Sequence, residues 1–149
     1  MKINIIYESH FGNGKRIIDE LTRILKSKDQ DVKLFSVKET SPKEIPSADL
    51  YIFSSPTRKF TLPPDISNFI DNYIPPKNNA KYALMTTYLD PRTIALKKMT
   101  AKLDGKKMKK AANDFKVRAA GLKGPIKEDY LDRLLVFSEE LIKISALSQ

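Results

Sequence analysis

The sequence predicts an α/β fold in which a doubly wound parallel sheet carries helices on both faces. Short apolar segments alternate along the whole chain with longer segments in which apolar residues recur every three or four positions. These are the patterns of buried strands and amphipathic helices, and their alternation is typical of parallel sheets. In addition, the first apolar segment ends in a glycine-bearing loop that leads directly into a helix. Five strands and at least four substantial helices fit within the 149 residues.

The first strand, the first helix and the second strand follow from the pattern of residues 2–37. Residues 2–7 are apolar enough for a buried strand. From Gly14 to about Lys28 the spacing predicts an amphipathic helix with these apolar positions: Ile17, Ile18, Leu21, Ile24 and Leu25. Residues 32–37 alternate between apolar and polar side chains, which indicates a strand at an edge of the sheet.

The middle of the chain predicts a helical turn, a central strand and a helix. The turn covers residues 41–45, whose serine and proline provide the cap and the first helical position. Residues 48–53 form a central strand that stops at Ser54-Ser55-Pro56. A loop rich in Thr, Lys and Pro follows. The next helix starts near Pro64 and buries an apolar face made of Ile66, Phe69 and Ile70.

The last third of the chain predicts two more strands and two helices. Residues 82–86 form a fourth, buried strand, and residues 115–119 alternate as a fifth. Between them, Pro91 opens a helix that carries Ile94, Leu96, Met99 and Leu103. The final helix runs from Lys127 to about Ile144. There is no repeat, low-complexity tract or linker, so we expect one domain over residues 1–149.

The composition excludes several kinds of site. Cysteine is absent and histidine occurs once. Disulfides, thiol nucleophiles, cysteine-ligated clusters and multi-histidine metal sites within one chain are therefore excluded, and we expect no metal. No apolar run approaches the length of a membrane span. The first strand begins so early that it leaves no room for a signal peptide, so we expect a soluble, cytoplasmic protein.

The charge of the chain is strongly positive and concentrated in one segment. The net charge is +9 at neutral pH. Residues 97–118 hold eight Lys and one Arg against two Asp, a net charge of +7 in that segment alone. Two interpretations stay open: a solvated helix face with a basic loop, or a docking surface for an acidic partner or a nucleic acid.

The segment Ser9-His10-Phe11-Gly12-Asn13-Gly14-Lys15 lies between the first strand and the first helix. Such a loop can hold a phosphate, because its backbone N–H groups and the helix N-terminus converge on the anion. The spacing matches neither the dinucleotide fingerprint nor the P-loop. It resembles the phosphate loop of flavodoxins, S/T-x-T-G-N-T. Ser9, Gly12 and Asn13 match this pattern, whereas Phe11 and Gly14 replace its threonines.

Other segments extend the resemblance to flavodoxins over nearly the whole chain. Ser54-Ser55-Pro56-Thr57 resembles the G-S-P-T segment that begins the flavin-flanking loop of that family. Residues 63–71 resemble its proline-opened helix. Gly124-Pro125-Ile126, before the long final helix, has counterparts in short flavodoxin-like domains. The order of these motifs is more specific than any one of them.

The resemblance implies a flavodoxin-like three-layer sandwich with a five-stranded parallel sheet in the order 2-1-3-4-5. In such a sheet, ligands bind outside the carboxyl ends of the strands, where the strand order reverses. That point lies between the first and third strands. Three loops, residues 9–15, 55–63 and 87–92, are then expected to converge on one crevice.

The cofactor that the resemblance implies is one FMN, bound non-covalently. Its expected binding residues come from the three loops: Ser9, His10, Phe11, Gly12, Asn13, Gly14, Lys15, Ser55, Pro56, Thr57, Arg58, Phe60, Thr87 and Tyr88. Tyr88 either stacks on the flavin ring or covers the end of the sheet. Arg58 stands where the family usually has Tyr or Trp, and Phe60 is a second candidate for the missing aromatic. His10 either approaches the phosphate or the flavin, or is an exposed loop residue.

The two missing threonines and Lys15 have opposite effects on phosphate binding. Each lost hydroxyl donor removes about 0.5–1.5 kcal/mol, and a charge-assisted bond from Lys15 contributes about 1.5–3 kcal/mol. These magnitudes nearly cancel. FMN binding is therefore retained if Lys15 reaches the phosphate.

The leading hypothesis is a flavodoxin-like electron carrier without catalytic residues of its own. Reduction of a small quinone-like substrate is a variant of it. Because flavodoxins are typically acidic and this chain is basic, we expect a less negative flavin potential and a redox partner with an acidic docking face. One cation about 8 Å from the ring stabilises its reduced anion by about 2 kcal/mol at an effective dielectric constant of 20.

Two other functions are weighed against the electron carrier. One is a flavodoxin-fold binding module that has lost the flavin and docks an acidic protein or nucleic acid through residues 97–118. Within that segment Phe115 is the only aromatic residue, which disfavours nucleic acid. The other is a receiver-type signalling domain, which would need a carboxylate cluster after the first strand. Glu8 stands there without one.

Overall fold

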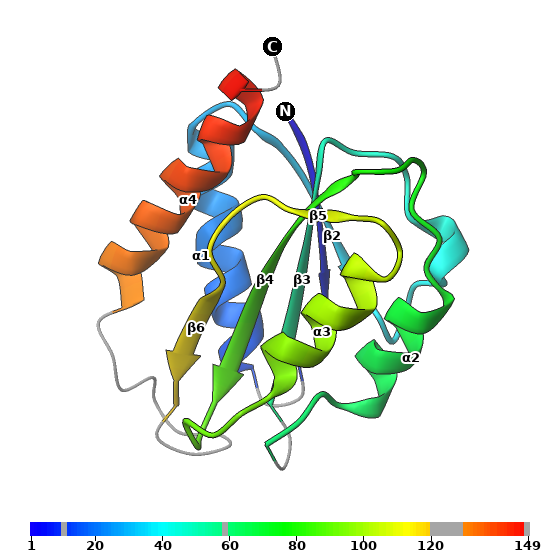
Figure 1. Ribbon diagram of the computed structural model, residues 1–149. Helices are drawn as coiled ribbons and strands as arrows, with labels where there is room; N and C mark the ends of the chain where they lie inside the picture. The colour runs from blue at the N-terminus through cyan, green and yellow to red at the C-terminus, as the bar shows by residue number, and fades with distance from the viewer. Residues whose placement is uncertain (10–11, 58–59, 120–129, 148–149) are drawn as a thin grey trace.

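The computed structural model describes residues 1–9, 12–57, 60–119 and 130–147 (Figure 1). The features predicted at His10, Phe11, Arg58, residues 124–126 and the start of the last helix lie outside these ranges. The strands are β1 (Lys2–Tyr7), β2 (Asp31–Ser36), β3 (Leu50–Pro56), β4 (Lys81–Tyr88), β5 (Lys109–Lys110) and β6 (Phe115–Arg118). The helices are α1 (Asn13–Ser27), the 3₁₀ turn η1 (Pro42–Glu44), α2 (Pro64–Asn72), α3 (Ala95–Asp104) and α4 (Tyr130–Leu147).

The sheet is parallel throughout and confirms the predicted order. Its strands follow as β2, β1, β3 and β4, and both β5 and β6 pair with the outer edge of β4. The fifth position of the sheet is therefore filled by two short strands. Lys81 pairs with Lys109, and four residues later Met85 pairs with Phe115. The outer chain advances by six residues over that distance, so two residues bulge out between β5 and β6.

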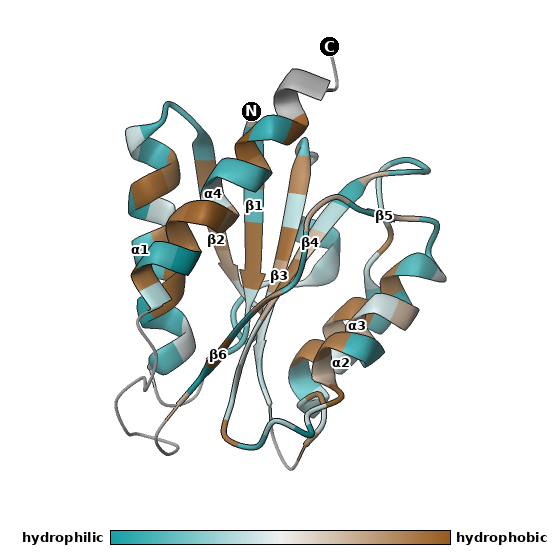
Figure 2. Cartoon of the chain, turned by 60° about the vertical axis from the view of Figure 1, so that its left-hand side comes forward, coloured by the Kyte–Doolittle hydropathy of each residue, from teal (hydrophilic) through white to brown (hydrophobic). Residues whose placement is uncertain are grey.

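Helices cover both faces of the sheet, as the three-layer prediction requires (Figure 1). Alternate residues of β1 point to opposite sides: Ile3 and Ile5 join the cluster under α1 and α4, and Ile6 joins the cluster under α2 and α3. Figure 2 shows α1 and α4 on one side of the sheet with hydrophobic stretches along both helices. Burial of these two apolar layers is the main driving force for the fold.

Two strands extend further than their apolar segments predict. β3 continues through Pro56 instead of stopping at Ser54, because Ser54 and Ser55 are buried and paired with the neighbouring Met85 and Thr86. β4 likewise continues to Tyr88. Ladder hydrogen bonds to neighbouring strands satisfy the backbone here, whether or not the side chains are apolar.

Helix α3 begins at Ala95, four residues after the proline that was predicted to open it. Asp90 is the reason. Its side chain accepts a hydrogen bond from the Arg92 backbone N–H at 2.8 Å, and its carbonyl oxygen accepts one from Thr93 N–H at 3.3 Å. These bonds fix a turn over residues 90–93, and the Thr93 hydroxyl then accepts from Ala95 N–H at 3.2 Å.

None of the helices in the described part of the chain combines the length and the apolar character that a membrane span requires.

Candidate functional site

The carboxyl ends of β1, β3 and β4 lie side by side, at the bottom of the sheet in Figure 1. Glu8 N–H donates to the Ser54 carbonyl oxygen at 3.0 Å, and Thr57 N–H donates to the Thr87 carbonyl oxygen at 2.8 Å. The sheet therefore brings the ends of the three predicted loops together. Thr87 and Tyr88 belong to the end of β4, so the third loop begins after them.

Helix α1 starts at this edge with an open N-terminus. Gly12 is its N-cap and has a φ of 91°, a conformation that favours glycine. Apart from its two chain neighbours, no described residue has an atom within 4 Å of the place where a Gly12 β-carbon would sit. The first turn contains no acidic residue, and its N-cap residue, a glycine, supplies no side-chain hydrogen bond. The Lys15 N–H donates to the Ser9 hydroxyl oxygen at 3.3 Å, but no described residue accepts from the N–H groups of Asn13 and Gly14.

Asn13 carries an unsatisfied polar atom at the same place. Its side chain is only 6% exposed, and its Oδ1 atom has no hydrogen-bond partner among the described residues. A buried amide without a partner costs about 1–3 kcal/mol. An unpaired buried atom of this kind calls for a partner outside the described residues, such as a water, an ion or a ligand. Unbonded backbone donors and an unpaired buried amide thus belong to the same turn of α1.

On the other face of the sheet, a side chain from a distant part of the chain binds the N-terminus of α2. Glu8 directly follows β1, is 2% exposed, and accepts a hydrogen bond from Ile66 N–H at 2.8 Å. A carboxylate from another part of the chain thus occupies the positive end of the α2 dipole. α3 receives the Thr93 hydroxyl in the same way. Sequence reasoning missed Glu8 because its partner lies 58 positions away.

Lys15 has a partner on its own helix. Its ammonium lies 2.6 Å from a carboxylate oxygen of Asp19 and 5.7 Å from the centroid of the Tyr7 ring. The hydrogen bond to Asp19 raises the pKa of Lys15 against a smaller lowering by desolvation. Both side chains are more than one third exposed, and exposed pairs contribute only about 0–1 kcal/mol. Exchange of Asp19 for a bound anion therefore costs little.

Three threonines join the second and third loops. The Thr57 hydroxyl lies 3.1 Å from that of Thr86 and 2.8 Å from that of Thr93. The Thr86 hydroxyl donates to the Ser55 carbonyl oxygen at 2.7 Å, and the Ser55 hydroxyl donates to the Pro56 carbonyl oxygen, also at 2.7 Å. The hydroxyls of the predicted site residues Ser55 and Thr57 are thus satisfied within the protein, and the bonds of Thr57 fix the relative positions of the two loops.

Two aromatic side chains remain accessible beside these loops, and each lies next to a cation. Tyr88 is half-buried, and the Lys116 ammonium is 6.0 Å from the centroid of its ring. Phe60 is 46% exposed, with the Arg92 guanidinium 4.9 Å from its ring centroid. Phe60 has a φ of 68°, a left-handed conformation rare for aromatic residues. Strain of this kind is concentrated at functional sites.

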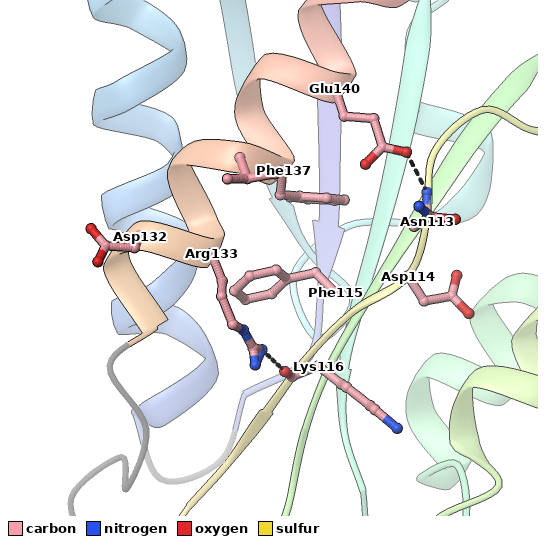
Figure 3. Close-up of a pocket in the computed structure, with 9 residues that line it drawn as sticks. Asn113, Asp114, Phe115, Lys116, Asp132, Arg133, Phe137 and Glu140 are labelled. Atoms are coloured by element: carbon pink, nitrogen blue, oxygen red, sulfur yellow. Dashed lines mark hydrogen bonds between the residues drawn. The ribbon is translucent and has the colours of Figure 1, made fainter.

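A separate groove of about 490 Å³ lies between β6 and α4 (Figure 3). Its charged side chains bind the backbone of the outer strand: Arg133 donates to the Lys116 carbonyl oxygen, and Glu140 accepts from Asn113 N–H at 2.9 Å. In the described sheet, β6 pairs only with β4. These side chains therefore cover part of an open sheet edge, a common protection against edge-to-edge association.

The comparisons with known proteins agree with this architecture. The sequence profile of the flavodoxin domain matches residues 4–135, so the chain belongs to the flavodoxin domain family. No curated protein sequence matches the chain.

Solved structures with the same fold include several flavodoxins. Oxidised flavodoxin 2 from Bacillus cereus has a TM-score of 0.81 and 21% identity, with 96% of this chain and 99% of that chain covered. The flavodoxin of Streptococcus pneumonia TIGR4 has a TM-score of 0.80 and 20% identity, with the same two coverages. Rubredoxin oxygen:oxidoreductase from Desulfovibrio gigas has a TM-score of 0.76 and 19% identity over 97% of this chain, but only 36% of that chain is covered. At these identities the likeness establishes the fold.

Proposed function

We propose that this chain binds one FMN non-covalently at the carboxyl edge of the sheet and acts as an electron carrier. The observation that carries this proposal is the open N-terminus of α1. On the other face of the sheet, α2 receives a carboxylate and α3 a hydroxyl from the protein. At α1 the Ser9 hydroxyl accepts from Lys15 N–H, but no described residue accepts from the N–H groups of Asn13 and Gly14. An anionic phosphate is the natural complement of such a helix end.

The residues present fit the phosphate of FMN. The N–H groups of Asn13 and Gly14 supply donors, and apart from its chain neighbours no described residue crowds the β-carbon position of Gly12 before them. The Ser9 hydroxyl is placed beside them by its bond with Lys15 N–H. The Asn13 side chain lacks a partner that a ribityl hydroxyl would provide. Lys15 is near enough in sequence to add a charge once it leaves Asp19.

The end of β4 and the loop before α2 would hold the ring. Tyr88 and Phe60 offer apolar faces at the two loops that flank the expected position. The threonine cluster of Thr57, Thr86 and Thr93 keeps these loops at a fixed separation. When bound, FMN supplies the redox chemistry by taking up and releasing electrons, and the protein supplies orientation and electrostatics. We further propose that residues 1–149 form one domain.

The test is reconstitution of the purified chain with FMN, combined with one isosteric variant. We expect the two visible absorption bands of oxidised flavin, quenched FMN fluorescence and one FMN per chain. Asn13→Asp places a carboxylate in the first turn of α1. It should weaken FMN binding about 100-fold or more by repulsion, while leaving the stability of the flavin-free protein equal or higher.

Asn78→Asp is the matched control, because Asn78 is an exposed residue just before β4, at the other end of the sheet. It changes the net charge equally and should leave FMN binding unchanged. A chain that leaves FMN fluorescence unquenched, or an Asn13→Asp variant that binds FMN as tightly as the wild type, would contradict the proposed function.

A further inference from the structure

The basic segment of residues 97–118 does not form one surface. Lys102 lies 2.5 Å from a carboxylate oxygen of Asp71, and Lys106 donates to the Asp71 carbonyl oxygen. Lys110 lies 2.9 Å from Asp114. These three cations tie α2, α3 and the outer strands together. The carboxylates of Asp71 and Asp114 offset the charges of Lys102 and Lys110, whereas Lys106 reaches only a backbone oxygen.

Lys116 and Arg118 lie at the carboxyl end of the sheet, next to the candidate site. In the register of β6 with β4, Lys116 pairs with Thr86 and Arg118 pairs with Tyr88. Paired residues of parallel strands point to the same face of the sheet, so both cations share the face of Tyr88. Both are exposed, and neither forms a salt bridge within the described part of the chain.

Asp90 is an acidic residue close enough to Arg118 to feel its charge, and Arg92 already neutralises it. The Arg92 guanidinium lies 2.7 Å from the Asp90 carboxylate. The hydrogen bonds from Arg92 lower the pKa of Asp90 to about 2, and the charge of Arg118 adds to the effect. We call Asp90, Arg92, Lys116 and Arg118 the Tyr88 rim. Three cations and one carboxylate give it a net charge of +2.

We propose that the Tyr88 rim is the docking surface for a redox protein with an acidic face. This inference rests on the proposed function, because it places the exchange of electrons beside the bound FMN. Transient redox complexes bury little surface, below about 1,200 Å², and depend on charge to steer encounter. Two unpaired cations beside an accessible aromatic ring suit such a partner.

A nucleic acid fits the rim less well. Proteins that bind nucleic acids typically neutralise about 6–10 phosphates, and here two free cations lie on one short strand. The remaining exposed lysines of the segment are spread over α3 and the far end of the sheet (Lys97, Lys98, Lys107 and Lys109). They do not continue the rim along a groove, so we assign the surface to a protein.

The test uses one haem protein in two charge states. Native cytochrome c is basic, and succinylation converts its lysine amines to carboxylates. In each reaction one electron passes from reduced FMN on the chain to ferric haem iron, which becomes ferrous. At an ionic strength on the order of 10 mM, we expect the succinylated form to react about tenfold faster than the native form. The preference should fall as salt is added.

Charge-removing variants test whether the faster reaction with succinylated cytochrome c depends on the Tyr88 rim. Lys116→Gln with Arg118→Gln should reduce the ratio to about three or less. Lys28→Gln with Lys109→Gln removes the same charge at the opposite end of the sheet, from exposed lysines at the end of α1 and in β5, and should keep the ratio. Lys116→Arg with Arg118→Lys preserves the charge and should also keep it. FMN fluorescence quenching is measured for each variant beforehand.

The outcomes separate this inference from the proposed function. A chain that binds no FMN overturns both. A chain that binds FMN but reacts faster with native cytochrome c, or whose preference survives in the Lys116→Gln, Arg118→Gln variant, overturns the docking inference alone. Tight binding of a mixed-sequence DNA oligonucleotide that the same variant abolishes would assign the rim to nucleic acid and likewise overturn it.

Discussion

Gly14 is the second residue of α1, and its backbone lies against Ser9. A β-carbon at Gly14 would sit 3.6 Å from the Ser9 hydroxyl oxygen and 3.8 Å from the Ser9 β-carbon, ordinary contact distances. Its φ is not positive, unlike that of Gly12. The backbone therefore accepts a side chain at position 14, where the flavodoxin pattern has threonine. The fold therefore does not require glycine at position 14, and the absence of a threonine hydroxyl there is a feature of this sequence.

We expect Gly14→Thr to tighten FMN binding. One added hydroxyl donor contributes about 0.5–1.5 kcal/mol, which corresponds to about a 2- to 12-fold lower Kd. Gly14→Val has nearly the same shape without the hydroxyl, so it serves as the control for helix propensity and packing. Titration of FMN fluorescence measures both. Equal affinities of the Thr and Val variants would contradict a phosphate at this helix end.

Lys15 illustrates what sequence reasoning can and cannot predict for single residues. The loop pattern placed Lys15 beside the candidate phosphate. In the structure its backbone N–H lies at that place, where it donates to the Ser9 hydroxyl. Its side chain pairs with Asp19, four residues along the helix. That pair was readable from the i, i+4 spacing alone. The lack of a hydrogen-bond partner for Asn13 Oδ1 could not be predicted from the sequence, because burial depends on residues that are distant in the chain.

At the scale of the elements, the ends of the helices distinguish the candidate site from ordinary structure. Glu8 leaves β1 and caps α2 across the sheet edge, so one carboxylate couples the first strand to a helix of the opposite half. A charge buried at 2% exposure needs such a partner, because desolvation would otherwise be costly. Glu8 is thus a structural carboxylate at the sheet edge, and the α1 N-terminus beside it is the proposed phosphate site.

Glu8→Ala should lower the free energy of unfolding by about 1–3 kcal/mol, since it removes a buried cap from α2. Glu8→Gln keeps an acceptor oxygen and should cost less. Asp65→Asn changes an exposed carboxylate in the first turn of the same helix, so it should cost under about 0.5 kcal/mol. Urea denaturation of the three variants measures these differences. A stability loss for Asp65→Asn as large as for Glu8→Ala would show that general charge, rather than the specific cap, matters.

Helices and strands whose apolar residues recur at regular spacing could be predicted from the sequence. Elements that exist only because they pair with a neighbouring strand could not. The sheet order and the helices α1 and α2 follow from periodicity and from the family pattern. The two-residue strand β5 has only lysine side chains and exists because it pairs with Lys81 and Tyr82. The start of α3 was misplaced because the Asp90 turn overrides the preference of proline for a first helical position. Local signals cannot report such tertiary or turn-specific bonds.

At the scale of the whole molecule, the net charge of +9 is unevenly spread. A salt bridge to Asp71 offsets the charge of Lys102 between α2 and α3, whereas Lys116 and Arg118 leave a positive field beside Tyr88. A bound flavin becomes more negative when it is reduced. Nearby cations therefore stabilise the reduced form and raise its potential.

We expect Lys116→Gln to make the potential of the bound flavin more negative by about 20–80 mV. This range follows from an interaction of up to about 2 kcal/mol at an effective dielectric constant of 20, reduced by solvent screening. Lys109→Gln removes an equal charge at the far end of the sheet and should shift the potential by less than about 10 mV. Spectroelectrochemical titration measures both. Equal shifts would mean that total charge, and not the position of Lys116, sets the potential.

The central claim is that the open N-terminus of α1 binds the phosphate of FMN, and a comparison of FMN with riboflavin tests it most directly. The two ligands share the ring and the ribityl chain and differ in the phosphate. Two charge-assisted bonds from the N–H groups of Asn13 and Gly14, each about 1.5 kcal/mol or more, predict that FMN binds about 100-fold more tightly than riboflavin. Equal affinities in calorimetric titrations, or no binding of either ligand, would contradict the claim.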